Sequence, residues 1–404
     1  MTAGTLLRRM AQDDKPYRVY RGGRVKGKVP AVPGKTSQKP PGTPTGSSRR
    51  PHLPRPKLPG RGSWKHIVLL GLLVFVVLVI AWGVTGFLAF QHGVGAANKR
   101  FDRDRGARAA LSKSNGFLLT HATTILLIGT DSSTSAGRSG DRHADSLMII
   151  RTDPSHHRLA YLSLPRDLLV PIPGVGSTKI NASYQYGGAA LAVETVRQFT
   201  GIPIDHVVEV DFNSFKALID AEGGITINVP EPILSNRFDC PYKTQARCLE
   251  WKGWRFRRGP QHMDGERALI YSRVRENQLN PGDNDLTRGA RQQAVMEGVT
   301  AKLTSLTTLI GLPFHGKALM SPLTTDLSTA QMLELGWVKF RSSGSHALYC
   351  RLGGDATSAG GSSVIIPSED NRSVIAMWDG LSAPQPPTTT YGPGCVAGHP
   401  IETS

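Results

Sequence analysis

The chain has 404 residues, enough for one large or two ordinary domains, and 39% of them are hydrophobic, as in a globular protein. Its formal net charge is +17, but residues 1–65 alone hold 16 Lys and Arg against Asp13 and Asp14, a net +14. The basic character therefore belongs to a tail. Because this tail lacks the aromatic interleaving of nucleic-acid-binding domains and has no folded domain that could bind a groove, we do not predict nucleic acid as a partner.

Two segments precede any folded domain. Residues 1–65 are rich in Pro, Gly and Ser and poor in large apolar residues, so we predict a disordered tail. Residues 67–90 are uncharged and mostly apolar, and about 20 such residues span a bilayer, so we predict a transmembrane helix over 66–90. A buried core helix of this length would keep a polar face, and a cleaved signal peptide would be shorter and nearer the N-terminus.

The charge distribution also predicts the orientation in the membrane. Because the positive charge lies before the apolar segment, the positive-inside rule places the tail in the cytoplasm. Residues from about 91 onward are then extracytoplasmic, and the protein is a single-pass plasma membrane protein. Residues 91–120 are polar and Arg-rich, and we expect a helical or irregular stalk there.

Four cysteines lie on the predicted outer side of the membrane. An even number in an oxidising compartment indicates two disulfides, and the short separation favours Cys240–Cys248, which leaves Cys350–Cys395. No histidine stands at metal-ligand spacing from these cysteines, so a zinc site is not expected.

Two acids lie at the mouths of neighbouring predicted strands. Residues 123–131 form a continuous apolar run that ends at Asp131, and Asp145 stands just ahead of a second apolar run. A third strand over 158–164 follows an Asp-Pro turn and completes a hairpin. Two carboxylates placed in this way could bind one Mg²⁺ ion together with phosphate oxygens of a substrate. Each acid could instead have a capping role or form an ion pair.

A basic residue follows the third strand directly. Pro165 cannot donate to a sheet, so the chain must leave the sheet there and Arg166 is aimed out of its end. Guanidinium groups match phosphate geometry, and ligands bind beyond strand ends in open α/β sheets. The alternative is that Arg166 pairs with Asp167 or with another surface acid.

The next 120 residues alternate between helical and extended patterns. Lys179 and Asn181 lead into a helix opened by Gly187 and Gly188, whose N-terminus suits an anion. Extended patterns at 206–211 and 225–230 flank a helix over 212–222, and the chain from 231 to 260 reads as a long loop. This alternation predicts an α/β fold, an α/β/α sandwich with a central mixed sheet.

A second basic group follows that loop. Arg273 and Arg275 are two residues apart and share a face if the chain is extended. Arg288, Arg291 and Gln292 line one side of a helix that starts near Asp283. Each of these arginines could belong to a solvated surface, but together with Arg166 they favour a pyrophosphate or polyanion site.

These motifs, taken in order, carry a family resemblance. The sequence from about 120 to 300 resembles the LytR-CpsA-Psr family in its ordered motifs: Ile128-Gly129-Thr130-Asp131, Ala144-Asp145-Ser146, Ser163-Leu164-Pro165-Arg166-Asp167, Lys179-Ile180-Asn181, Tyr184 with Gly187-Gly188, Ala221-Glu222-Gly223-Gly224-Ile225, Leu269-Ile270-Tyr271-Ser272-Arg273-Val274-Arg275 and Asp285 to Gln292. One departure is Arg142-His143-Ala144-Asp145, where the family often has Arg-Ser-Asp.

The resemblance implies an extracytoplasmic phosphotransferase. Such enzymes move a glycopolymer from a polyprenyl pyrophosphate carrier onto peptidoglycan through a phosphodiester. It assigns Mg²⁺ to Asp131 and Asp145, and places Arg166, Asp131 and Asp145 in catalysis. The residues it implies for the pyrophosphate are Arg166, Arg273, Arg275, Arg288, Arg291, Gln292, Lys179 and Asn181. It places a catalytic domain at 121–310 and leaves 311–404 as a C-terminal extension of the outer domain.

Two other functions fit the same residues. One is a polyprenyl pyrophosphate phosphatase with water as acceptor, and the other is a non-catalytic wall-binding or regulatory membrane protein. The acceptor hydroxyl of a transferase needs a base, and the sequence offers Asp131 or Asp167 without deciding between them. The sequence predicts neither the polymer nor the oligomeric state.

Overall fold

In the computed structural model, residues 63–404 form one compact unit. The residues that it describes are 61–104, 106–112, 116–132, 142–238, 240–280, 288–320, 322–342, 344–359, 361–389 and 392–401. Residues 1–60 of the predicted disordered tail, the side chain of Arg142 and the start of the helix near Asp283 lie outside them, whereas residues 61–65 of that tail are helical.

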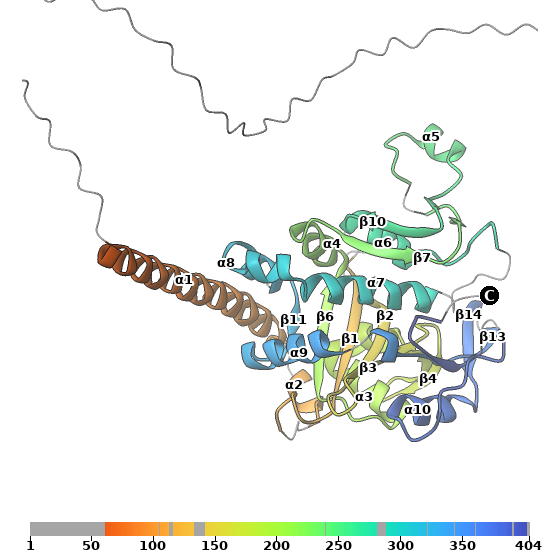
Figure 1. Cartoon of the computed structure of the whole chain (residues 1–404). Helices are drawn as coiled ribbons and strands as arrows, with labels where there is room; N and C mark the ends of the chain where they lie inside the picture. Colours follow the sequence, from red (N-terminus) through yellow and green to blue (C-terminus); the bar gives the residue numbers. More distant parts are fainter. Residues whose placement is uncertain are drawn as a thin grey trace, which may run out of the picture. The chain divides into compact units, whose positions relative to one another are not determined.

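The first helix, α1 (Arg61–Phe101), contains the predicted apolar segment but is longer than expected (Figure 1). It is the one candidate membrane span in the part of the chain that the structure describes. Its side chains are exposed over most of the apolar segment, whereas Phe90, Val94, Ala97 and Phe101 are buried against the outer domain. The spacing of these four residues puts them on one face of the helix. Residues 91–101, for which we expected a helical or irregular stalk, are helical and continue α1 into the domain core.

A seven-stranded mixed sheet forms the centre of the outer domain. Strands β6 and β1 are parallel, as are β3 and β12, and the other neighbouring pairs are antiparallel. In spatial order the strands are β11 (Thr324–Thr325), β6 (His206–Asp211), β1 (Thr123–Ser132), β2 (Arg142–Asp153), β3 (Arg158–Leu164), β12 (Leu348–Arg351) and β15 (Gly394–Ala397). The predicted strands that end in Asp131 and Pro165 are thus confirmed as β1 and β3, next to β2.

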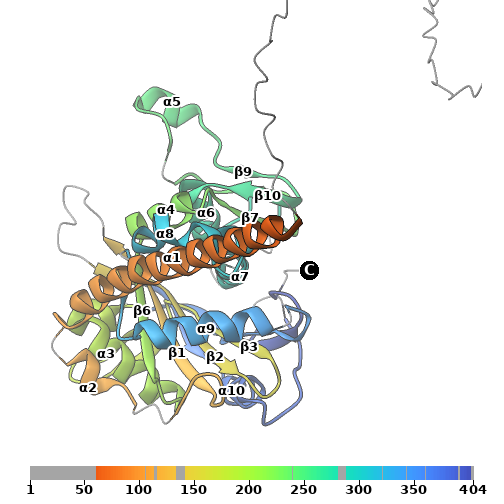
Figure 2. The same cartoon turned by 60° about the vertical axis from the view of Figure 1, so that its left-hand side comes forward.

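Helices cover both faces of this sheet (Figures 1 and 2). Side chains alternate between the faces along β1: Leu126 and Ile128 join the core beneath α3 (Ala182–Thr200), whereas Leu127 belongs to the core beneath α9 (Thr329–Arg341). Helix α2 (Ala107–Ala110) and helix α10 (Asn371–Asp379) lie on the α3 side. The predicted α/β/α sandwich is confirmed.

Residues after 310 belong to this sandwich. They supply β11, β12 and β15, as well as α9 and α10. The expected boundary at residue 310 falls inside α8 (Leu306–Met320). Residues 311–404 are therefore an integral part of the fold and not an extension of it, because the sheet depends on their strands.

A smaller layer lies beside the sheet. It consists of α4 (Phe212–Ala221), α6 (Gly265–Arg273), α7 (Arg288–Leu303), α8 and a two-stranded sheet of β7 (Ile225–Val229) and β10 (Gly259–Met263). The helix at 212 and the strand at 225 are confirmed, although that strand pairs outside the central sheet. The remaining elements are β4 (Leu169–Ile172), β5 (Gly176–Lys179), β8 (Ile233–Leu234), α5 (Gln245–Glu250), β9 (Arg255–Phe256), η1 (Gly344–His346), β13 (Gly354–Ala359) and β14 (Ser362–Pro367).

Both predicted disulfides are present. Cys240–Cys248 closes a short loop that contains the start of α5. Cys350–Cys395 joins β12 to β15, where the two residues stand opposite each other in the antiparallel register. The second bridge ties the C-terminal segment to the central sheet.

Candidate active site

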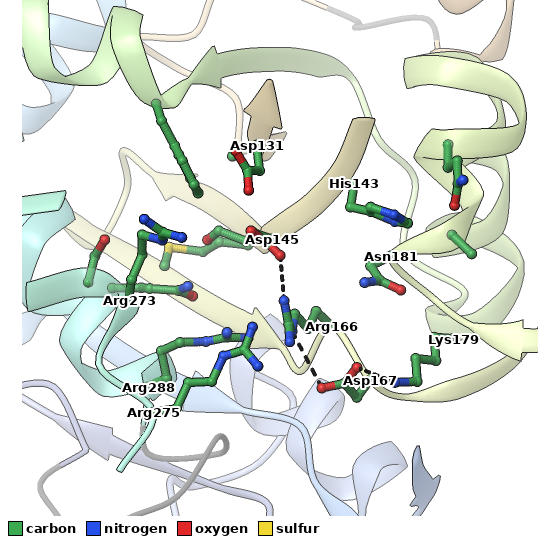
Figure 3. A pocket seen from close by; sticks show the side chains of 18 of the residues that line it. Asp131, His143, Asp145, Arg166, Asp167, Lys179, Asn181, Arg273, Arg275 and Arg288 are labelled. Carbon is green, nitrogen blue, oxygen red and sulfur yellow. Dashed lines mark hydrogen bonds and ion pairs between the residues drawn. The ribbon is translucent and has the colours of Figure 1, made fainter. Parts of the chain in front are cut away.

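A cavity of about 1050 Å³ opens between the ends of β1, β2 and β3 and the helices α4, α6 and α7. It gathers nine of the ten residues expected to bind pyrophosphate or metal, as Figure 3 shows for most of them. The predicted residues that line it are Asp131, Asp145, Arg166, Lys179, Asn181, Arg273, Arg275, Arg288 and Gln292. Segments more than 150 residues apart in the sequence thus meet in one place.

A β-bulge places Asp145 in the cavity. Gly129 pairs with Ser146 and Thr130 pairs with Ala144, so Asp145 is the extra residue on β2. A bulge re-aims the side chain that it carries, because the regular alternation of faces is broken there. Asp145 and Ser146 therefore both line the cavity, together with Asp131 from β1.

Arg166 lies between two carboxylates. Its Nη1 is 2.5 Å from Oδ1 of Asp145, and its Nε is 3.4 Å from Oδ2 of Asp167. The other oxygen of Asp167 accepts from Lys179 Nζ at 3.0 Å. The expectation that Arg166 binds an anion and the alternative that it pairs with Asp167 are thus compatible, since these contacts fix its guanidinium at the cavity wall (Figure 3).

The same charges act on the pKa of Asp167. Burial alone would raise it, but the positive charges of Arg166, Lys179 and Arg288 outweigh burial and lower it. A carboxylate with a lowered pKa is a weak base. Asp167 is therefore poorly suited to accept a proton from an acceptor hydroxyl.

Arg273 and Arg275 reach the cavity from the end of α6. The condition of an extended chain does not hold up to Arg273: Asp264 caps a helix by accepting from the backbone N–H of Arg267 at 2.8 Å, and the helix ends at Arg273. The guanidinium of Arg273 lies 4.8 Å from the ring centre of Phe212. This cation–π contact holds the charge beside the cavity.

Helix α7 carries three of the predicted site residues, and only two of them reach the cavity. Arg288 and Gln292 are four residues apart and both line the cavity, as the helical spacing predicted. Arg291 does not line it, and its expected role in pyrophosphate binding is not supported by its position. Its Nη2 donates to the carbonyl of Val274 at 2.8 Å, between Arg273 and Arg275. Arg291 thus holds the segment that carries two cavity arginines.

Gln293 fixes α7 to the sheet. Its Nε2 donates to Ser163 Oγ at 3.0 Å and to the carbonyl of Cys350 at 2.9 Å, and the residue is buried. The two acceptors belong to the parallel neighbours β3 and β12. This contact sets the position of Arg288 and Gln292 over the strand ends.

One part of the cavity is apolar. Leu127 and Met148 contribute from the sheet, Phe215 from α4, and Val295 and Met296 from α7. The basic and acidic side chains are thus continuous with an apolar wall between the sheet and the helices. Such a cavity can hold a ligand with a charged group and a hydrocarbon chain.

The Gly187–Gly188 pair lies inside α3 and not at its start. Helix α3 begins at Ala182, after Asn181, and both glycines have non-helical backbone angles that kink it. Beyond the kink, the N–H of Ala189 donates to the carboxylate of Asp104 at 2.9 Å. The anion at this helical N-terminus is therefore an acid of the chain itself.

Sequence reasoning missed several cavity residues. His143 stands opposite Asp131 in the β1–β2 register and lines the cavity, as do Tyr186, Phe212 and Phe238. The alternation along β2 could have indicated His143. Phe238 comes from the long segment before Cys240, which carried no sequence signal for this site. Arg273 lies 5.8 Å from its ring centre.

The two acids at the strand ends, Asp131 and Asp145, are the residues that could hold a magnesium ion. No group of three or more His, Cys, Asp or Glu residues that could hold a metal occurs among the described residues. Asp131 and Asp145 both present oxygen donors to the cavity (Figure 3). Mg²⁺ is commonly bound by one or two carboxylates together with phosphate oxygens and water, so this donor set fits the ion when a phosphate ligand is present.

A comparison of the sequence with known families shows to which family the chain belongs. Residues 86–371 match the profile of the LytR_cpsA_psr family. The chain belongs to the LytR-CpsA-Psr family. It is 33% identical over 249 residues to polyisoprenyl-teichoic acid–peptidoglycan teichoic acid transferase TagV of Bacillus subtilis (strain 168), covering 61% of this chain and 59% of TagV. It is 30% identical over 279 residues to TagU of Bacillus anthracis, covering 67% of this chain and 82% of TagU.

Solved structures of this family share the fold. A crystal structure of B. subtilis TagV has a TM-score of 0.50 at 27% identity, with 64% of this chain and 97% of that one covered. A structure of TagT bound to LI-WTA has a TM-score of 0.51 at 24% identity, with 66% and 93% covered. The mixed sheet between helices is therefore the LytR-CpsA-Psr fold.

Proposed function

We propose that this LytR-CpsA-Psr protein is a phosphotransferase that attaches a glycopolymer from a polyprenyl pyrophosphate carrier to peptidoglycan. The observation that carries the proposal is one cavity that joins four arginines and two strand-end acids to an apolar wall. The charged part suits a pyrophosphate and the apolar part suits a prenyl chain. The transferase names of TagV and TagU support the same reaction.

The reaction is a displacement at phosphorus. An acceptor hydroxyl oxygen forms a bond to the phosphorus next to the glycan, and the bridging P–O bond breaks, so that polyprenyl phosphate leaves and a phosphodiester remains. Arg166, Arg273, Arg275 and Arg288 neutralise the negative charge that spreads over the phosphate oxygens. The proton of the acceptor hydroxyl passes to a base, and the lowered pKa of the ion-paired Asp167 makes that carboxylate a weak one.

A magnesium ion is part of the proposal. Asp131 and Asp145 would hold it, and it would add positive charge beside the phosphates. Arg166 binds Asp145 at 2.5 Å and so fixes the orientation of that carboxylate. Lys179 and Asn181 line the same wall and support Arg166 through Asp167 and the backbone.

The proposed location of this chemistry is the outer face of the plasma membrane. The basic residues before α1 favour a cytoplasmic N-terminus. Two disulfides in the domain after α1 fit an oxidising compartment and support the same orientation.

A reconstituted transfer reaction tests the function. The full chain in vesicles is incubated with a lipid-linked glycan, peptidoglycan and Mg²⁺, and the products are analysed by mass spectrometry. A glycan–phosphate–peptidoglycan adduct that requires Arg166 supports the transferase. Inorganic phosphate without an adduct would instead support a phosphatase. Binding of polymer without any turnover would support a wall-binding or regulatory protein.

A further inference from the structure

Helix α8 presents an apolar surface that none of the described residues covers. Leu306, Leu309, Ile310 and Phe314 are exposed, Phe314 at 87% and Leu306 at 72%. Residues 303–316 contain no Asp, Glu, Lys or Arg, whereas lysines stand on either side at 302 and 317. The spacing of 306, 310 and 314 forms a stripe along one face of the helix.

The opposite side of α8 is fixed to the domain. The Thr308 hydroxyl donates to the carboxylate of Glu222, and His315 Nδ1 lies 3.0 Å from the other oxygen of that acid. Leu319 and Met320 join the core of the smaller layer. The exposed stripe is thus held outward and does not result from a loosely attached helix.

Helix α8 packs closely against α1. A Cβ atom on Gly86 would lie 3.3 Å from Leu312 Cβ and Pro313 Cδ, and one on Gly93 would lie 2.8 Å from Met320 Cβ. Small residues at such positions let two helices approach closely, as in membrane helix pairs. The order of these contacts shows that both helices run in the same direction, and both views place them side by side (Figures 1 and 2).

The contact at Gly86 sets the depth of α8. Gly86 belongs to the apolar segment 67–90 of α1, so residues 312 and 313 stand at the level of its last turns. Leu306 to Ile310 lie further toward the N-terminal, more deeply apolar part of that segment. If α1 spans the membrane, the exposed stripe of α8 cannot remain in water.

We infer that α8 is a second membrane-contacting helix, which inserts its stripe of Leu306, Leu309, Ile310 and Phe314 among the lipid acyl chains of the leaflet on the domain side. The inference rests on the membrane-spanning assignment of α1. Lys317 follows the apolar stretch on the domain side and suits the lipid headgroups there. Helix α4 lies between α8 and the cavity, because its Phe215 lines the cavity and its Leu218 and Ile219 join the core that contains α1 and α8. The insertion therefore fixes the height of the cavity above the bilayer, within reach of a lipid-linked substrate.

Single-cysteine labelling of the full chain tests this contact. All four natural cysteines are in disulfides, so one introduced thiol can carry a bimane fluorophore. The test positions are Ile310→Cys and Phe314→Cys in vesicles of phosphatidylcholine and phosphatidylglycerol with brominated acyl chains. Leu73→Cys in α1 is the positive control, and Leu381→Cys, which is exposed beyond α10 on the other side of the sheet, is the aqueous control.

The inference predicts that bimane at 310, 314 and 73 loses most of its emission to brominated lipid, while bimane at 381 is quenched by iodide alone. Quenching at 73 together with iodide quenching at 310 and 314 would overturn it, without affecting the assignment of α1. Shielding from both quenchers at 310 and 314, with inter-chain disulfides between single-cysteine chains, would assign the stripe to a second copy and would also overturn it.

Discussion

Arg166 Nη1 lies 2.5 Å from Asp145 Oδ1, and this ion pair joins the end of β3 to the bulge of β2. A second contact to Asp167, at 3.4 Å, holds the other side of the guanidinium. The charge at the cavity wall is therefore oriented before any ligand arrives. Orientation in advance is what makes such a group effective in stabilising developing phosphate charge.

Replacing Arg166 with lysine tests this orientation. Lysine keeps the charge but cannot span Asp145 and Asp167 with a planar fork. We expect Arg166→Lys to lower the transfer rate about a hundredfold, the cost typical of one lost stabilising group. Arg372→Lys, on the exposed face of α10, is the control and should leave the rate unchanged. More than half of the wild-type rate in Arg166→Lys would contradict the role of the fork.

Two adjacent glutamines of α7 should respond differently. Gln292 lines the cavity, whereas Gln293 is buried and binds Ser163 and Cys350. Gln293→Ala leaves buried acceptors without a donor, so we expect the free energy of unfolding to fall by about 1–3 kcal/mol. Gln292→Ala should lower transfer without a change in thermal unfolding temperature. Equal losses of stability in the two variants would show that Gln292 also acts through the fold.

The metal proposal predicts a dependence on magnesium. Chelation with EDTA should abolish transfer, and added Mg²⁺ should restore it. Asp131→Asn should raise the Mg²⁺ concentration needed for half-maximal rate by about tenfold or more, because a carboxylate ligand is lost. Asp102→Asn, at the surface beyond α1, is the matched control. Full activity in EDTA would remove the metal from the account.

The pH dependence of stability should be visible at Asp153. Burial alone would raise the pKa of this acid at the end of β2, but hydrogen bonds from Ser155, His156 and Arg158 lower it to about 2. Because this folded-state pKa is below the unfolded value of about 4, Asp153 stabilises the fold above about pH 4 and loses that effect as the pH falls toward 2. At pH 7 the free energy of unfolding of Asp153→Asn should therefore be about 1 kcal/mol below that of the wild type, with a correspondingly lower unfolding temperature. The two proteins should converge near pH 2, and a constant difference would contradict this assignment.

The strand ends that build the site could be predicted from sequence because short-range rules govern them. The apolar runs before Asp131 and Pro165 and the Asp-Pro turn after β2 depend only on neighbouring residues. The sequence could also pair the cysteines by spacing. The bulge at Asp145 could not be predicted from the sequence, because it arises only from the pairing of β1 with β2.

The parts that could not be predicted depend on distant contacts. Nothing near Arg291 in the sequence reveals that its side chain binds the carbonyl of Val274 and not the cavity. The position of β12 beside β3 requires a parallel connection across nearly 190 residues, so residues after 310 looked like an extension. The apolar face of α1 beyond residue 90 becomes visible only against the domain that buries it.

The fate of one phosphorus atom tests the central claim most directly. A lipid-linked glycan is prepared with ³²P in the phosphate next to the sugar and is incubated with the full chain in vesicles, peptidoglycan and Mg²⁺. The account predicts that ³²P enters the insoluble peptidoglycan together with the glycan, and that Arg166→Ala prevents this transfer. Release of ³²P as inorganic phosphate, with unmodified peptidoglycan, would contradict it.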